Sequence, residues 1–160
     1  MEHSNSHQKT NPYTTFFLMI GLSFVAMYIT MYLNTYSIDH VYFSMTRFYM
    51  VSLGISAMAV IMLLFMLEMY KNKKKNTAIL LGSLVLFSSA LFLVRMQRPI
   101  IGDVLWLKGM IPHHSIAILT SERADIKDTE VRKLADAIIE AQRKEIEQMK
   151  VMIKRLENEK

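Results

Sequence analysis

Two short stretches of the sequence carry the side chains best suited to bind a metal ion. The first is Met110-Ile111-Pro112-His113-His114, which places a thioether and two imidazoles within five residues. The second runs from Gln142 to Met149 and contains the carboxylate of Glu145. Imidazole and thioether groups are ligands that favour copper, above all Cu(I), over magnesium or calcium. If the two stretches meet, the sequence predicts a transition-metal site.

The first stretch belongs to a predicted helix over about residues 104–123. Asp103 is expected to be its N-cap, after a hinge that contains Pro99 and Gly102. At about 100° per residue, Met110 and His114 share one stripe of this helix. Pro112 removes one backbone hydrogen bond and should bend the helix beside the imidazoles.

The second stretch lies on a longer predicted helix, which Asp128 should cap and which runs to about residue 157. Only Gln142 and Glu145 interrupt its apolar face. The polar turn over 125–128 is short, so the two helices should pack antiparallel and bring Met110 and His114 to this face. The remaining apolar positions of the face are Val131, Leu134, Ala135, Ile138, Ile139, Ile146, Met149, Met152, Ile153 and Leu156.

A buried carboxylate such as Glu145 is costly unless it is paired or bound to a cation, so it needs a partner. One interpretation is the metal site. The other is a hydrogen bond between Glu145 and His113 or His114 that only sets the register of the two helices. The spacing of the residues does not separate these two interpretations.

Three apolar runs precede this helical pair, over residues 13–33, 48–69 and 77–94. Each is long enough for a membrane crossing, which needs roughly 20 residues. The sequence therefore predicts an all-α protein with three transmembrane helices followed by a helical hairpin. The expected divisions are a disordered tail over 1–12, a membrane region over 13–98 and a soluble hairpin over 99–160.

Lysines predict the orientation of these helices. Four of the six residues over 71–76 are lysine, and loops on the cytoplasmic side carry the excess of Lys and Arg. We therefore expect the N-terminus in the cytoplasm and the hairpin outside, in an inner or plasma membrane. Arg95 and Arg98 oppose this orientation, but they are fewer than the lysines.

Composition narrows the function classes. The 160 residues contain no Cys, which rules out thiolate nucleophiles, Cys-type zinc sites and iron–sulfur clusters. The net charge of +5 is not gathered on one face, so we expect no nucleic-acid partner. No acidic residue or histidine lies in the middle of an apolar run, which argues against a proton-coupled transporter. Without a hydrolytic triad or phosphate loop, a binding protein is favoured over an enzyme.

The hairpin resembles the "domain of unknown function 305" family, a ferritin-like, helical and mostly bacterial family. The resemblance covers about residues 100–155, and some members are exported proteins that bind copper or silver through His and Met. It therefore implies Cu(I) or Ag(I) as the metal here. The residues that carry it are Asp103, Trp106, Gly109, Met110-Ile111-Pro112-His113-His114, Ala117, Glu130-Val131-Arg132, Leu134-Ala135, Ile138-Ile139, Gln142, Glu145-Ile146 and Met149.

Two departures from the family pattern matter. Members often follow His-His with Gln-Gly, whereas Ser115-Ile116 stands here. Many members also carry two hairpins, while this chain has one, so it should pair with a second subunit or lie against the membrane helices. A di-iron centre would need Glu-x-x-His, and neither Glu140 nor Glu145 begins that motif.

Two functions remain open. In the first, a protein in the lipid bilayer captures copper or silver through Met110, His113, His114, Glu145 and Met149, with Asp103 and Gln142 around these ligands. His40, in the same external region, could lend a further ligand. In the second, the hairpin binds no metal and dimerises to scaffold a membrane complex. A copper or haem oxidoreductase is the weakest alternative, because adjacent histidines on one helix cannot sandwich a haem iron.

Overall fold

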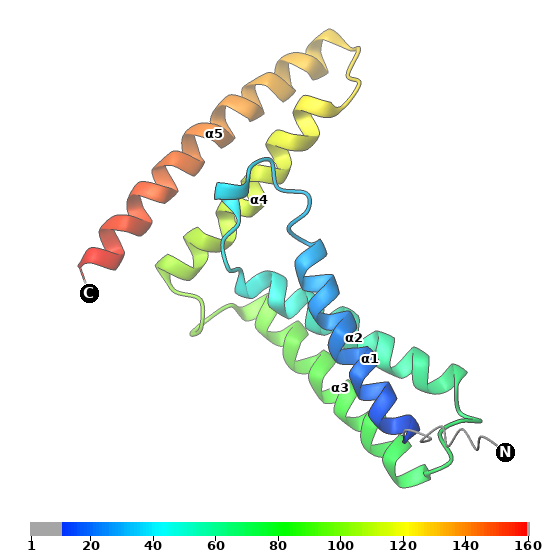
Figure 1. The fold of residues 1–160 in the computed structure, drawn as a ribbon. Coiled ribbons are helices and arrows are strands. Elements are labelled where there is room, and N and C mark those ends of the chain that lie inside the picture. Colours follow the sequence, from blue (N-terminus) through cyan, green and yellow to red (C-terminus); the bar gives the residue numbers. More distant parts are fainter. Residues whose placement is uncertain (1–10, 160) are drawn as a thin grey trace, which may run out of the picture.

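A computed structural model describes residues 11–159, and every regular element in that part of the chain is helical. Figure 1 shows a bundle of three helices and, beyond one end of it, a hairpin of two. The predicted all-α fold is thereby confirmed. In chain order the elements are α1 (Pro12–Thr30), the short 3₁₀ helix η1 (Ile38–His40), α2 (Met45–Phe65), α3 (Lys73–Met96), α4 (Asp103–Arg123) and α5 (Thr129–Asn158).

The bundle consists of α1, α2 and α3, each long and apolar enough to cross a membrane. Helix α2 packs on both of the others, whereas the backbones of α1 and α3 do not approach each other. Near the lysine-rich turn, side chains join α1 to α3, since the Tyr13 hydroxyl donates to Asn76 Oδ1 at 2.8 Å. The bundle is therefore closed at one end and split along part of its length.

The helices begin earlier than the apolar runs because polar side chains cap them. Asn11 Oδ1 accepts from the Tyr13 N–H at 3.0 Å, and Pro12 takes the first helical position, which suits its fixed φ. Helix α1 thus begins inside the stretch expected to be a tail; residues 1–10 of that stretch lie outside the described residues. Ser44 and Asn72 cap α2 and α3 in the same way, so Lys73 opens α3.

Two bundle helices end before their predicted limits. Thr30 and Phe65 end α1 and α2, whereas the apolar runs continue to 33 and 69. Residues 31–34 and 66–69 form turns with i to i+3 hydrogen bonds, such as Leu33 N–H to Thr30 O at 3.1 Å. Apolar composition thus continues past the point where the α-helical hydrogen-bond pattern stops.

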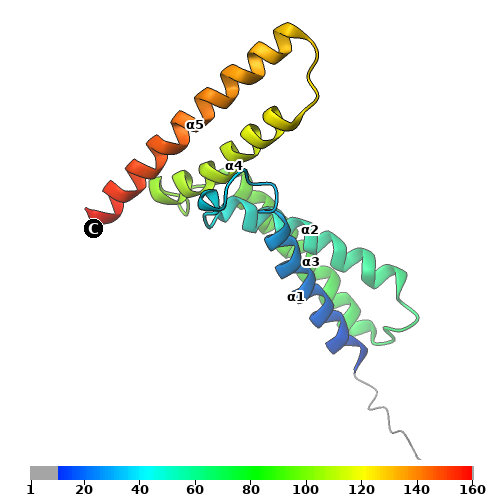
Figure 2. The same cartoon turned by 45° about the horizontal axis from the view of Figure 1, so that its top comes forward.

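Helices α4 and α5 form the predicted antiparallel hairpin (Figure 2). Asp128 caps α5 as expected, because its Oδ1 accepts from the Glu130 and Val131 N–H groups at 2.9 Å each. Asp103 is not the N-cap of α4. Gly102 holds that position, and Asp103 is the first helical residue, where its carboxylate faces the positive end of the helix dipole.

The seam between α4 and α5 is narrower than the apolar face of α5. A buried cluster fills the seam, built from Leu107, Ile111, Ile118, Ile146, Met149 and Ile153. Val131, Leu134, Ile138 and Met152 belong to the apolar pattern, but they are exposed, Leu134 to 62%. One hairpin therefore leaves part of the apolar face of α5 without a partner in the described chain.

The side of α4 away from α5 packs against the bundle end. Arg47, at the start of α2, is buried; its guanidinium donates to Met31 O and, at 3.4 Å, to Pro112 O in α4. The same guanidinium lies 4.3 Å from the Tyr32 ring centroid. Of the two arrangements expected for a single hairpin, contact with the membrane helices is present.

Candidate metal site

The structure brings His114 of α4 to Glu145 of α5. Nε2 of His114 lies 2.8 Å from Glu145 Oε2, and Nδ1 of the same ring lies 2.9 Å from Met110 O. The imidazole is mostly buried, with 12% of its side chain exposed, while the Glu145 side chain is 49% exposed. The sequence analysis expected a buried carboxylate on the apolar face, but Glu145 lies at the exposed edge of the seam.

The neighbours of the His114 ring are both hydrogen-bond acceptors. A neutral imidazole has one N–H, so it can donate either to Met110 O or to Glu145 but not to both. The other ring nitrogen would then direct its lone pair at an oxygen. An added cation resolves this conflict. It is either a second proton on the ring, which makes the ring an imidazolium, or a metal ion held between Nε2 and the carboxylate. The two acceptors beside one ring thus leave room for an added proton or another cation.

Two methionines lie one helical turn from this pair, one on each helix. Met110 precedes His114 by four residues, and Met149 follows Glu145 by four, so each lies one turn from its polar neighbour. Because α4 and α5 are antiparallel, both turns lead away from the connecting loop, in the same direction. Met149 is buried in the seam cluster and Met110 packs against that cluster.

His113 does not join this group. Its ring centroid is 6.2 Å from that of His114, and its exposed side chain lines a cavity of about 450 Å³ between α4 and the bundle. Arg47 and Trp106 line the same cavity. Consecutive residues on a helix point about 100° apart, so only one of the two imidazoles can face α5. That imidazole is His114, which shares the predicted stripe with Met110.

The remaining predicted residues are placed differently from one another. Gln142 is half-buried and lies one turn before Glu145 on the seam side of α5. Asp103 is exposed and is seven residues before Met110, about 10 Å along the helix axis. The structure therefore keeps Gln142 near the His114–Glu145 pair and places Asp103 away from it.

Over residues 11–159, no three His, Cys, Asp or Glu side chains gather closely enough to hold a metal ion. A site made only of such ligands is therefore not formed in this part of the chain. The seam offers one imidazole and one carboxylate in contact, with a methionine one turn away on each helix. This donor set fits a soft cation such as Cu(I) or Ag(I), which accepts sulfur ligands and low coordination, better than it fits a hard one.

A second polar cluster, which no pattern in the sequence indicated, joins the loop after α1 to the hairpin. Ser115 is fully buried; its Oγ accepts from the Tyr36 N–H at 2.7 Å and lies 2.9 Å from His40 Nδ1. Lys150 of α5 donates to Asp39 at 2.6 Å. Ser115, His40 and Asp39 follow one another as in a hydrolytic triad, but a hydroxyl without exposure cannot reach a substrate. The Ser115 hydroxyl instead holds the loop against α4.

Charges and burial shift the pKa values in this loop. Hydrogen bonds from Lys150 and Ser37 lower the pKa of Asp39 to about 2. Burial lowers the pKa of His40, against the opposing effect of Asp39. Burial alone would lower the pKa of Lys150, yet its hydrogen bonds to Asp39 and Glu147 outweigh this and raise it. His40 thus faces Ser115 and this ion pair, and the structure does not bring it to the His114–Glu145 pair.

Comparison with known proteins finds similarity in the hairpin and beyond it. The family model described as "Domain of unknown function (DUF305)" matches residues 97–157. An uncharacterized protein of Acanthamoeba polyphaga mimivirus is 34% identical over 135 residues, which cover 82% of this chain and 86% of that protein. This similarity is longer than the family match, so it extends into the bundle. No solved structure matches. The chain belongs to the DUF305 family, with the matched residues covering its α4–α5 hairpin.

Proposed function

We propose that the protein is a membrane-anchored metal-binding protein that captures Cu(I) or Ag(I) in its α4–α5 hairpin. The observation that carries this proposal is the contact between His114 Nε2 and Glu145 Oε2 at 2.8 Å. The other ring nitrogen, Nδ1, is hydrogen-bonded to Met110 O. The carbonyl orients the ring, as outer partners of metal-bound histidines generally do, and leaves Nε2 for a cation. A metal ion would take the place of the proton that this pair otherwise needs.

The donor groups divide between the two helices. His114 and Met110 would hold the ion from α4, and Glu145 and Met149 from α5, with Gln142 supporting the carboxylate. The ion would supply a positive charge that the seam lacks, and the protein would supply soft ligands and partial exclusion of water. His113 faces another cavity and is not required in this arrangement.

The proposed location is an inner or plasma membrane, with the hairpin outside the cytoplasm. The lysine-rich turn and the N-terminal end of α1 lie at one end of the bundle, and the hairpin lies beyond the other (Figure 1). Positive-inside loops then favour the lysine end in the cytoplasm. In this orientation the candidate site meets metal ions that arrive from outside the cell.

A second candidate function is a homo-oligomeric scaffold without a metal. The exposed Val131, Leu134, Ile138 and Met152 of α5 support it, because water-exposed apolar stripes of this kind mark protein interfaces. In this case the His114–Glu145 hydrogen bond only fixes the register of α4 against α5. The two candidates are compatible in principle, but they predict different behaviour of the same variants.

The test compares adjacent imidazoles. Binding of Cu(I) to the full chain in detergent is measured by competition with a chromophoric Cu(I) chelator, for wild type, His114→Ala and, as the matched control, His113→Ala. We expect His114→Ala to weaken binding at least about tenfold, the lower range for disturbing a metal site, and His113→Ala to change it little. Met149→Leu keeps the volume of the side chain and removes the sulfur, so it should also weaken binding.

Light scattering on the same samples gives the oligomeric state. Equal Cu(I) affinity in all four proteins, or none in the wild type, would overturn metal capture. A dimer that persists without metal and is lost in Leu134→Lys would then favour the scaffold.

A further inference from the structure

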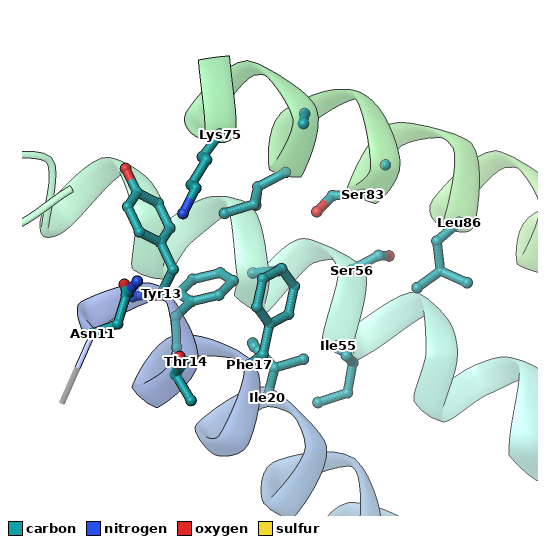
Figure 3. Close-up of a pocket in the computed structure, with 15 residues that line it drawn as sticks. Asn11, Tyr13, Thr14, Phe17, Ile20, Ile55, Ser56, Lys75, Ser83 and Leu86 are labelled. Atoms are coloured by element: carbon teal, nitrogen blue, oxygen red, sulfur yellow. The ribbon is translucent and has the colours of Figure 1, made fainter. Parts of the chain in front are cut away.

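The bundle contains a groove that the metal site does not use. It lies where α1 and α3 diverge from each other on the surface of α2, and its volume is about 600 Å³. Figure 3 shows its walls, with Phe17 from α1, Ile55 from α2 and Leu86 from α3. Phe17 and Leu86 are 59% and 44% exposed, so the groove opens on the outer surface of the bundle.

The groove changes character along its length. One end holds Asn11, Tyr13 and Lys75, with Lys75 Nζ 4.9 Å from the Tyr13 ring centroid (Figure 3). The other end is bordered by Ile55 and Leu86. Between Lys75 and Leu86, α3 advances eleven residues, about 16 Å, which is about half of the ~30 Å hydrocarbon core. The groove therefore has roughly the depth of one leaflet of a bilayer.

Small side chains of α3 create the space. Gly82 and Ala78 line the groove, and a Cβ built on Gly82 would meet nothing within 4 Å. Ser56 on the opposite wall is buried, but its hydroxyl donates to Leu53 O in its own helix at 2.8 Å and so needs no external partner. Apart from Ser56 and Ser83, the deep part of the groove offers an apolar surface. A void there would forfeit dispersion contacts, so it needs an apolar occupant.

The shallow end is positively charged. Lys71, Lys73, Lys74 and Lys75 lie at or beside it, and none of them takes part in an ion pair of the described chain. Glu68 is the single acidic residue between α2 and α3. An anionic group at the end of the groove would therefore meet unopposed cations. Basic pockets of this kind between membrane helices bind lipid headgroups.

We propose that the groove holds one acyl chain of an anionic phospholipid whose phosphate contacts Lys75. The depth of the groove favours a lipid over a helix from a second copy, because a membrane-crossing helix would have to match the whole thickness of the bilayer. The charge at the shallow end selects anionic over zwitterionic headgroups. This proposal does not depend on metal binding in the hairpin.

The experiment measures lipids that remain bound to the full chain by native mass spectrometry. The protein is purified from vesicles of equal parts phosphatidylglycerol and phosphatidylcholine with identical acyl chains. Gly82→Phe fills the groove, and Gly21→Phe is its matched control, since Gly21 on α1 is equally unobstructed but does not line the groove. Lys75→Ala removes the proposed phosphate contact, with Lys74→Ala as its control.

We expect the wild type to retain phosphatidylglycerol in preference, Gly82→Phe to lose it and Gly21→Phe to keep it. Lys75→Ala should reduce the preference about fivefold, the factor that corresponds to about 1 kcal/mol per lysine at a membrane surface, and more than Lys74→Ala does. Equal retention of both lipids by the wild type would overturn the proposal. A dimer that Gly82→Phe alone dissociates would also overturn it, by assigning the groove to a second copy.

Discussion

The bundle and the hairpin are both helical and both bury apolar clusters, but they expose opposite kinds of surface. The bundle turns large apolar side chains outward, such as Leu22 at 70% and Phe65 at 88% exposure. In α5 the outward positions are mostly charged, and apolar residues line the seam. The surface of the bundle thus suits lipid surroundings, and that of the hairpin suits water. In the hairpin, apolar residues at helical spacing decide which side of each helix is buried. In the bundle, apolar residues surround each helix, so packing depends on how the side chains fit together and on a few polar contacts at the helix ends.

The largest expected effect comes from removing seam volume, and it should differ between the two parts. Ile146 is 1% exposed in the seam, and Ile61 on α2 is 57% exposed. Ile146→Ala should destabilise the hairpin by about 2–5 kcal/mol, because it leaves a cavity. Ile61 lies on the exposed surface of the bundle, so Ile61→Ala should change the free energy of unfolding of the hairpin by less than about 0.5 kcal/mol. Hydrogen exchange of α5 amides in the full chain measures the effect of both variants. Comparable losses of protection in the two variants would contradict the difference between hairpin and bundle.

A smaller effect is expected where the two parts meet. Arg47→Gln removes a buried guanidinium that donates to carbonyl groups of both the bundle and α4. Hydrogen bonds from charged groups contribute about 1.5–3 kcal/mol, so the attachment of the hairpin should weaken by roughly this amount. The distribution of distances between spin labels on α2 and α4, measured by electron–electron resonance, should then broaden. Arg95→Gln, at an exposed position near the end of α3, is the control and should leave the distances unchanged.

The smallest effect is the pH dependence of the docked loop. Burial lowers the pKa of His40. The stability that neutral His40 contributes to the docked loop is therefore complete above about pH 6.5 and decreases as the pH falls below that value. Asp39, with its pKa at about 2, adds a second decrease as the pH falls from about 4 towards 2. Its side chain is 55% exposed, so its ion pair with Lys150 should contribute less than about 1 kcal/mol.

Hydrogen exchange of residues 36–44 at pH 7.5 and 5.5 checks the first decrease. We expect faster exchange at pH 5.5 in the wild type, after correction for the intrinsic rate. His40→Gln should remove the difference between the two values of pH. A loop with equal protection at both would contradict a role of His40 in docking.

The hairpin could be predicted from sequence because its information is local. Asp128 caps α5, the short turn forces an antiparallel pair, and the helical period then places His114 opposite Glu145. The direction of His113 could not be predicted, since the seam and the bundle compete for the two imidazoles and only packing decides. Likewise, nothing in the pattern showed that the seam would leave Leu134 exposed.

The polar contacts of the interface were not predictable for a different reason. Ser115 and His40 are 75 residues apart, and Arg47 and Pro112 are 65 apart. Such pairs depend on how the loop after α1 folds back on α4, which no periodicity describes. In the sequence, Ser115 stood out only as a departure from the pattern of the family that the hairpin resembles. In the structure it lies on another face of α4 from His114, where it holds the loop.

Three consecutive side chains of α4 end in three separate environments. His113 faces the cavity below the hairpin, His114 faces α5, and Ser115 faces the loop. Turning the helix about its long axis to improve any one of these fits would spoil the other two. These three contacts together fix the rotation of α4 about its own axis. A single inserted or deleted residue before this triplet would therefore disturb all three contacts at once.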